Sequence, residues 1–179
     1  MRIVLTLLGA ALASTSALAA GYNEKKLGDL SDDGLAPTTV TLKLGNNVIA
    51  GKYGSKSTPD GTVTDRDYFK IKIADGQQLS AIVLEPETEV GGNLSFIGVQ
   101  LGKQVTVPPV GGTPEDLLGW THYGTADEGT DLLPAICTGA GAQGCTPPLG
   151  PGTYSFWVQE LAVCKCRYRF TFTVTTPAP

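Results

Sequence analysis

Apolar and polar side chains alternate along three segments of the chain, which is the pattern of a β-strand with one buried and one solvent-exposed face. These segments are TTVTLKL at residues 38–44, DYFKIKI at residues 67–73 and RYRFTFTV at residues 167–174. Two further segments, residues 79–85 and 153–161, are apolar on both faces, and residues 94–102 are a further strand candidate. This second pattern favours central strands or strands with a second covered face.

Turn-forming residues separate these segments at short intervals, and helical periodicity is nearly absent. The turn signals are Gly45-Asn46-Asn47, Pro59-Asp60-Gly61, Asp75-Gly76, Gly91-Gly92-Asn93, Pro108-Pro109 and Gly150-Pro151-Gly152. Many short strands with turns rich in Gly and Pro are typical of two packed sheets. We therefore predict an all-β fold, an antiparallel β-sandwich of the jelly-roll kind.

The segment from residue 101 to residue 148 departs from the strand pattern and is rich in Gly, Pro and Thr. Within it, TPEDLLGW at residues 113–120 indicates one short helix, with Thr113 as N-cap and Pro114 at the first helical position. The apolar residues of the segment indicate that it packs against the sandwich. We call residues 101–148 the excursion. Long segments that leave a sandwich in this way often carry binding sites.

The N-terminal residues 1–20 have the features of a secretory signal peptide: an early cation at Arg2, an apolar stretch and a small-residue Ala17-Leu18-Ala19 ending. The apolar stretch is shorter than the roughly 20 residues that span a bilayer. Residues 21–179 then form a single domain, with a short disordered Pro-rich tail at 175–179. We expect a secreted protein, extracellular or periplasmic, with no membrane insertion.

The net charge is −4, and the basic residues are scattered along the chain. Binding to nucleic acid requires a concentrated basic face, so this composition argues against a nucleic-acid partner.

Four cysteines in an exported chain predict two disulfides: Cys137, Cys145, Cys164 and Cys166. Three pairings are open. We favour Cys137 with Cys145, because a short loop closes at low entropic cost. The remaining pair then requires a turn, since residues two apart in a regular strand have Cα atoms roughly 6.5 Å apart. The spacing lacks the paired ligands of a zinc site.

Catalytic motifs are absent, and the chain has one histidine, His122. Nucleophilic catalysis needs an activated side chain with a base beside it, and the sequence assigns no such pair. We predict that the protein is not an enzyme.

The aromatic residues around His122 are of more interest, because exposed aromatic rings stack on sugars in β-sandwich modules, although most Trp side chains are core. The candidate ligand-binding residues are Trp120, His122, Tyr123 and Trp157.

Two acidic segments could together supply oxygen ligands to a hard cation such as Ca²⁺. The first, at residues 28–37, contains Asp29, Asp32 and Asp33, and the second contains Asp65 and Asp67. Neither segment has the spacing of an EF-hand loop, so a site requires both. The alternative is that these aspartates form turns by capping their own backbone, which is our interpretation of Asp60-Gly61.

Several motifs, taken in order, resemble the bacterial pre-peptidase C-terminal domain. They are an acidic segment followed by Gly-x-Asn-x-x-x-Gly within residues 28–54, the strand TDRDYFKIKI with its Gly-x-x-Leu turn, the strand GTYSFWVQE and the strand YRFTFTV. Members of this family are β-sandwiches beside secreted proteases and other exported enzymes, and they are similar to collagen-binding domains of clostridial collagenases.

The resemblance implies a structural calcium ion between the two acidic segments, with Asp29, Asp32, Asp33, Asp65 and Asp67 as candidate ligands. It also implies a non-catalytic module that binds an extracellular polymer, either a glycan or a protein matrix. The alternatives are a structural or assembly protein of the cell surface or extracellular matrix, which would self-associate, and a small hydrolase.

Overall fold

The computed structural model describes residues 20–90 and 95–178. The expected signal peptide, apart from Ala20, and the expected turn at residues 91–93 lie outside the described residues.

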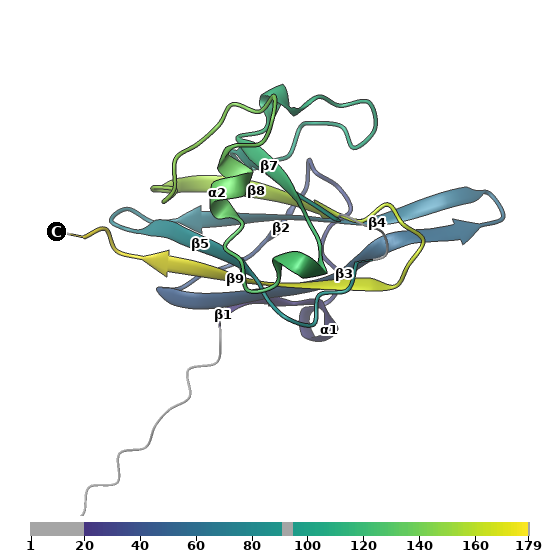
Figure 1. The fold of residues 1–179 in the computed structure, drawn as a ribbon, viewed down its shortest axis with the longest axis horizontal. Coiled ribbons are helices and arrows are strands. Elements are labelled where there is room, and N and C mark those ends of the chain that lie inside the picture. The colour runs from purple at the N-terminus through teal and green to yellow at the C-terminus, as the bar shows by residue number, and fades with distance from the viewer. Residues whose placement is uncertain (1–19, 91–94, 179) are drawn as a thin grey trace, which may run out of the picture.

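The described strands form a mostly antiparallel ladder that curls into two packed layers (Figure 1). In the order β5-β9-β3-β4-β8-β6-β7 each strand pairs with its neighbour, and β1 and β2 add in parallel to β3 and β4. The predicted antiparallel β-fold is confirmed. The strands are β1 (Ala20–Asn23), β2 (Thr38–Thr39), β3 (Gly45–Thr58), β4 (Gly61–Ile73), β5 (Gln78–Leu84), β6 (Ser95–Leu101), β7 (Gly119–Tyr123), β8 (Gly152–Gln159) and β9 (Cys166–Thr175).

The core lies between the layers and is lined by the apolar faces that the alternation predicted. From β4, Phe69, Ile71 and Ile73 are buried, and Phe69 meets Phe172 of β9 with ring centroids 5.9 Å apart. The ring of Phe156 on β8 also meets the Phe172 ring, with centroids 5.2 Å apart. Each fully buried side chain of this size stabilises the fold by about 1.5–3 kcal/mol. These rings therefore hold β4 and β8 against β9.

The predicted strand at 38–44 is confirmed only at its first two residues and the predicted turn at 45–47 is wrong, because the chain crosses between the layers here. β2 ends at Thr39, and β3 already begins at Gly45. The crossing is held by Asn47, a fully buried residue whose Oδ1 accepts the Lys43 N–H at 2.7 Å. Its Nδ2 donates to the carbonyl oxygens of Lys43 and Gly45, and to Phe172 of β9 at 3.2 Å.

The described helical elements are short: α1 (Glu24–Leu27), α2 (Leu133–Cys137) and the 3-10 turns at Pro114–Asp116 and Thr125–Asp127. The helix expected at 113–120 is one 3-10 turn, because Leu117 is already extended and Gly119 starts β7. The sequence did not predict α1 or α2, which span four and five residues. In the described part of the chain, no helix has the length and apolarity needed to cross a membrane.

Two disulfides join Cys137 to Cys145 and Cys164 to Cys166, the pairing that the sequence favoured. The second pair has Cα atoms 5.3 Å apart, and β9 begins only at Cys166, so the required bend is present. The first pair closes the loop after α2, whose Leu133 and Ile136 are buried. Part of the excursion is therefore fixed to the sandwich by packing, and its Cys137–Cys145 loop is closed covalently on itself.

We predict that Asn47→Ala destabilises the protein by about 2–4 kcal/mol, because it removes the four hydrogen bonds of a fully buried side chain, one of them to the buried Phe172 carbonyl. The melting temperature should fall by roughly 5–10 °C, measured by circular dichroism. Asn46→Ala is the matched control: Asn46 is exposed and accepts one bond from Thr173, so its effect should stay within about 0.5 kcal/mol. Equal melting temperatures for both variants would contradict the proposed role of Asn47.

Candidate functional sites

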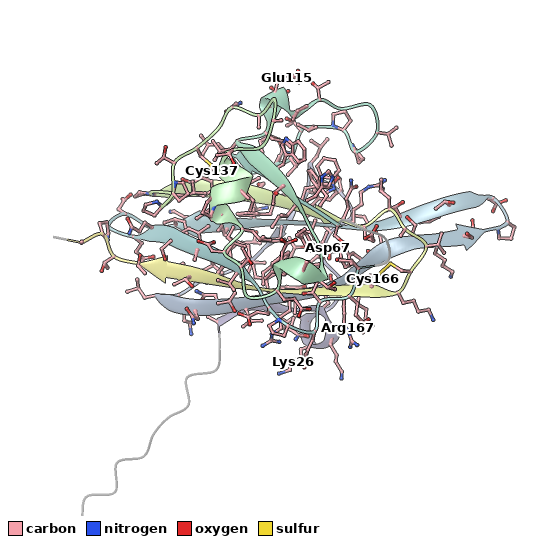
Figure 2. All side chains as sticks on the ribbon, viewed as in Figure 1. Lys26, Asp67, Glu115, Cys137, Cys166 and Arg167 are labelled. Carbon is pink, nitrogen blue, oxygen red and sulfur yellow. A yellow bond between two sulfur atoms is a disulfide. The ribbon has the colours of Figure 1, made fainter. Side chains whose placement is uncertain are left out.

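Three carboxylates from separate parts of the chain meet beside the core. One oxygen each from Glu24, Asp29 and Asp67 lies within 4.8 Å of the others. Asp67 stands on β4 within the body of the sandwich, whereas Lys26 and Arg167 lie at its surface (Figure 2). Glu24 begins α1, which is held nearby because β1 pairs with β3. We call these three residues the carboxylate cluster.

Asp67 is fully buried, and neither of its carboxylate oxygens has a hydrogen-bond partner among the described residues. The nearby hydroxyl of Tyr168 also lacks one. Space for both groups exists because residue 51 is Gly: a Cβ there would lie 2.7 Å from Asp67 Oδ2 and 2.6 Å from Tyr168 Oη. A buried carboxylate is costly, so Asp67 is stabilised by a proton, by a cation, or by the adjacent Tyr168 hydroxyl and Glu24 carboxyl, which influence its pKa.

The electrostatics of the cluster favour the neutral forms of its acids when no cation is present. Burial, followed by the charge of Glu24, raises the pKa of Asp67 to about 10. Burial also raises the pKa of Asp65 to about 7, with further contributions from Asp29 and Asp32. The pKa of Glu24 is raised as well, chiefly by burial. A divalent cation would reverse these shifts, because an adjacent positive charge favours the ionised carboxylate.

The structure brings together some of the expected metal ligands and separates others. Asp29 and Asp67 are in the carboxylate cluster, and Asp65 lies half-buried within its electrostatic reach. Two further residues instead cap the backbone, because Asp32 accepts the Arg66 N–H at 2.9 Å and Asp33 accepts the Leu35 N–H at 2.8 Å.

Sequence reasoning missed Glu24, because its segment showed no strand or ligand pattern. Its carboxylate accepts the N–H groups of Leu30 at 3.0 Å and Lys52 at 2.6 Å, which orients it. The turn interpretation of Asp60-Gly61 is confirmed between β3 and β4. The resulting donor set is all oxygen, which suits Ca²⁺, so Glu24, Asp29 and Asp67 could hold this ion.

A second candidate site is a row of aromatic rings on the outer face of the layer formed by β4, β8, β6 and β7. Tyr68 stacks on Trp157 with centroids 5.8 Å apart, and Trp157 meets Phe96 edge-on at 4.8 Å. Phe96 stacks on Trp120 at 6.0 Å, and Trp120 meets His122 at 5.3 Å. Successive residues of a strand point to opposite faces, and each of these side chains lies an odd number of residues from a core residue of its strand. They therefore share the outer face.

The row is continuous because β6, the strand between the two tryptophans, carries a glycine. Gly98 is the register partner of both Trp120 and Trp157. A Cβ at this position would lie 2.9 Å from Cζ of Phe96, so the Phe96 ring lies over the glycine. The absence of a side chain at residue 98 therefore lets Phe96 form a floor between the flanking tryptophans.

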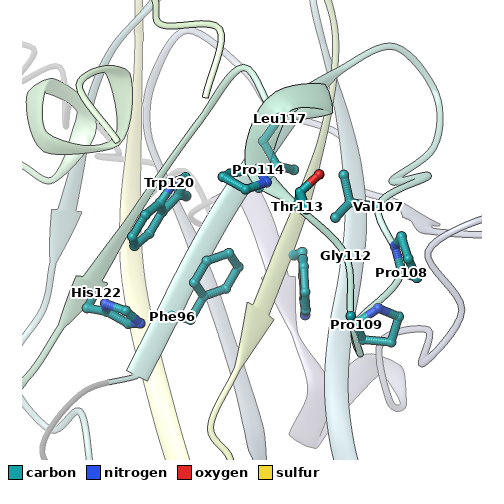
Figure 3. A pocket seen from close by; sticks show the side chains of 12 residues that line it. Phe96, Val107, Pro108, Pro109, Gly112, Thr113, Pro114, Leu117, Trp120 and His122 are labelled. Atoms are coloured by element: carbon teal, nitrogen blue, oxygen red, sulfur yellow. The ribbon is translucent and has the colours of Figure 1, made fainter. Parts of the chain in front are cut away.

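The excursion covers one end of the row and leaves the other accessible. Val105, Val107 and Leu117 pack with Tyr68 and Trp157 into a second hydrophobic cluster. Beside it is a hollow of about 260 Å³, which we call the aromatic groove. In Figure 3, Trp120 and His122 form one side, the loop with Pro108 and Pro109 forms the opposite side, and Pro114 and Leu117 close one end. Phe96 and Trp157 also line the groove.

The groove is neutral and has few polar groups. Among the described residues that line it, none is Asp, Glu, Lys or Arg. The Trp120 Nε1–H donates to the Ala140 carbonyl at 2.9 Å, but the Trp157 Nε1–H is buried with no partner. His122 is exposed at the rim. Its lining neighbours include no carboxylate or thiol that could act with it in catalysis.

Three of the four predicted ligand-binding residues line the groove: Trp120, His122 and Trp157. The expectation for Tyr123 is corrected, because this side chain is fully buried in the main core, where it meets Phe170 at 5.3 Å. It alternates with His122 along β7 and therefore points to the opposite face. Sequence reasoning missed Phe96, whose strand is apolar on both faces and so gave no signal of side.

Comparison of the chain with models of known protein families, with curated proteins and with solved structures finds no match.

We predict that millimolar Ca²⁺ raises the melting temperature above its value in chelator by roughly 5–10 °C. A Ca²⁺ concentration of a hundred times Kd stabilises the folded state by about 2.7 kcal/mol. Each kcal/mol raises the melting temperature of a protein of this size by a few degrees. Asp67→Asn should abolish the shift, whereas Asp60→Asn, in the exposed β3–β4 turn, should retain it. Identical curves with Ca²⁺ and with chelator would reject a structural ion at this cluster.

In chelator, we predict that stability falls as the pH rises from 5 to 9. A folded-state pKa above the ordinary value of 3.8 contributes stability that is complete at acid pH and is lost as the pH passes the raised value. The loss should begin just above the ordinary value of 3.8, where the unfolded chain ionises, and end near pH 7 for Asp65 and near pH 10 for Asp67.

The measurement for this pH dependence is the urea midpoint at pH 5, 7 and 9 in chelator. Asp67→Asn, which cannot ionise, should flatten the decline between pH 7 and 9. A wild-type midpoint that rises over this interval would contradict the assigned shifts.

Proposed function

We propose that this protein is a secreted, non-catalytic module that binds an extracellular polymer through the aromatic groove. The observation that carries the proposal is the accessible end of the aromatic row, where Trp120 and His122 face a hollow that the excursion leaves uncovered. Aromatic rings in a core normally pack against other side chains on all sides. Exposed rings beside a concave surface are typical of recognition sites.

A binding role also agrees with the chemistry of the groove. Its lining combines aromatic and proline side chains with a small number of polar groups, which is the usual composition of a ligand site. The one histidine of the chain has no catalytic partner among the described lining residues. The resemblance to the pre-peptidase C-terminal domain points the same way, since those domains accompany exported enzymes.

We further propose a structural role for calcium. An ion held by Glu24, Asp29 and Asp67 would connect the β1–α1 segment to β4 and would neutralise a buried charge that otherwise has no partner. The proposed export supports this assignment, because extracellular calcium is abundant enough to occupy weak sites. Export itself is supported by the predicted signal peptide and by the two disulfides.

We predict that the protein is retained on at least one insoluble extracellular polymer in a sedimentation assay with cellulose, chitin and fibrillar collagen. Trp120→Ala should reduce the bound fraction at least tenfold, because a lost aromatic contact removes a large part of the energy of such a site. Val63→Ala is the matched control, since Val63 is a 62% exposed apolar residue on the β3–β4 hairpin, outside the groove.

Melting curves should show that both variants are folded. Absence of retention on every polymer, or equal retention of Trp120→Ala and wild type, would overturn the proposed function.

A further inference from the structure

We infer that the aromatic groove receives one ring of a neutral polysaccharide. This inference rests on the proposed function and names the class of polymer. Its first support is charge: the described lining residues include no Asp, Glu, Lys or Arg. Carboxylates, sulfates and phosphates are normally bound by Arg or Lys, and a uronic acid, a sulfated sugar or an acidic peptide would find neither residue in this lining. The ligand that fits a neutral lining is neutral.

The size and shape of the groove suit one ring-sized group. Its volume of about 260 Å³ is smaller than the roughly 300–1,000 Å³ of sites that enclose whole drug-sized molecules. Pro114 and Leu117 close one end, and the sides are formed by Trp120 with His122 and by Pro108 with Pro109 (Figure 3). Because one end is closed, one unit of a chain can occupy the groove while its neighbours lie outside it.

The distribution of polar atoms matches a pyranose ring. Such a ring has an apolar C–H face and a rim of hydroxyl groups. The apolar face would lie against Phe96, which the absent side chain of Gly98 allows to lie flat along the floor. The indole N–H of Trp157 has no hydrogen-bond partner among the described residues, but it is buried and offers no exposed donor to the groove, so the floor stays apolar. The imidazole of His122 can form hydrogen bonds with sugar hydroxyls at the rim of the groove.

A proline-rich peptide is the competing ligand, because proline rings also dock on aromatic grooves. A polyproline II segment advances about 3.1 Å per residue, and recognition of it relies on several successive residues along an open groove. The closed end prevents this arrangement. A polysaccharide instead presents the same unit many times, so an insoluble polymer offers a high local concentration of rings to a single groove.

Intrinsic fluorescence tests this inference directly, because the chain has two tryptophans and both line the groove. The purified protein is titrated with cello-, xylo- and chito-oligosaccharides of six units, with an oligogalacturonate as the anionic control, and with a (Pro-Pro-Gly) repeat peptide. We expect a saturable change with at least one neutral oligosaccharide, at about millimolar Kd because one ring offers few contacting atoms. The oligogalacturonate and the peptide should produce no saturable change.

Two variants locate the site. Gly98→Ala should weaken binding at least tenfold, since the new methyl group displaces the Phe96 ring from the floor. Trp120→Phe keeps an aromatic face, so its Kd should stay within about threefold of the wild-type value. In this variant the fluorescence change comes from Trp157. Melting temperatures confirm that both variants are folded. Binding that is unchanged in Gly98→Ala would overturn the assignment of the ring to this floor.

The outcomes separate this inference from the proposed function. Saturable binding of the peptide or the oligogalacturonate, with none by the neutral sugars, would overturn the inference and leave a polymer-binding module. Retention on insoluble polymers without any soluble ligand bound in the groove would also overturn it. Absence of both retention and fluorescence change would overturn the two together.

Discussion

β3 and β4 are each long enough to pair in both layers, and this sharing determines how the remainder of the chain is placed. The first half of β3 pairs with β9 and β1, and its second half pairs with β4. β4 then continues into the other layer beside β8. Because one hairpin belongs to both sheets, the ladder curls instead of splitting, and the aromatic core is enclosed between its halves.

The same strand also separates the two candidate sites. Successive residues of a strand point to opposite faces, so Asp67 faces inward toward the carboxylate cluster while Tyr68 faces outward and begins the aromatic row. The inward site connects the N-terminal segment to the sandwich, and the outward site is completed by the excursion. A change in the register of β4 by one residue would exchange these environments and destroy both.

The sequence predicted the elements whose pattern is local and failed where distant residues decide. The alternation at 67–73 and 167–174 placed the second half of β4 and nearly all of β9, because each segment shows by its own pattern which face is buried. The crossing near Gly45 depends on Asn47, whose side chain reaches a carbonyl of β9 in a segment 125 residues away.

The candidate sites divide in the same way. Asp29 and Asp67 belong to acidic segments that the sequence displays, but Glu24 joins them only because β1 pairs with β3. Trp120, His122 and Trp157 were recognisable as candidates from residue type. Tyr123 was assigned to the wrong face because the five residues of β7 do not show by their pattern which face is buried. Phe96 was missed because its place in the groove depends on the absent side chain of Gly98, two residues away.

The loop closed by Cys137 and Cys145 has a consequence for recognition. Its Ala140 carbonyl accepts the indole N–H of Trp120, and Gly139 packs so closely on the Trp120 backbone that a Cβ would lie 2.4 Å from its carbonyl oxygen. The covalent loop thus holds the ring in one orientation before any ligand arrives. The conformational entropy of this side chain is lost during oxidative folding, so binding need not supply it.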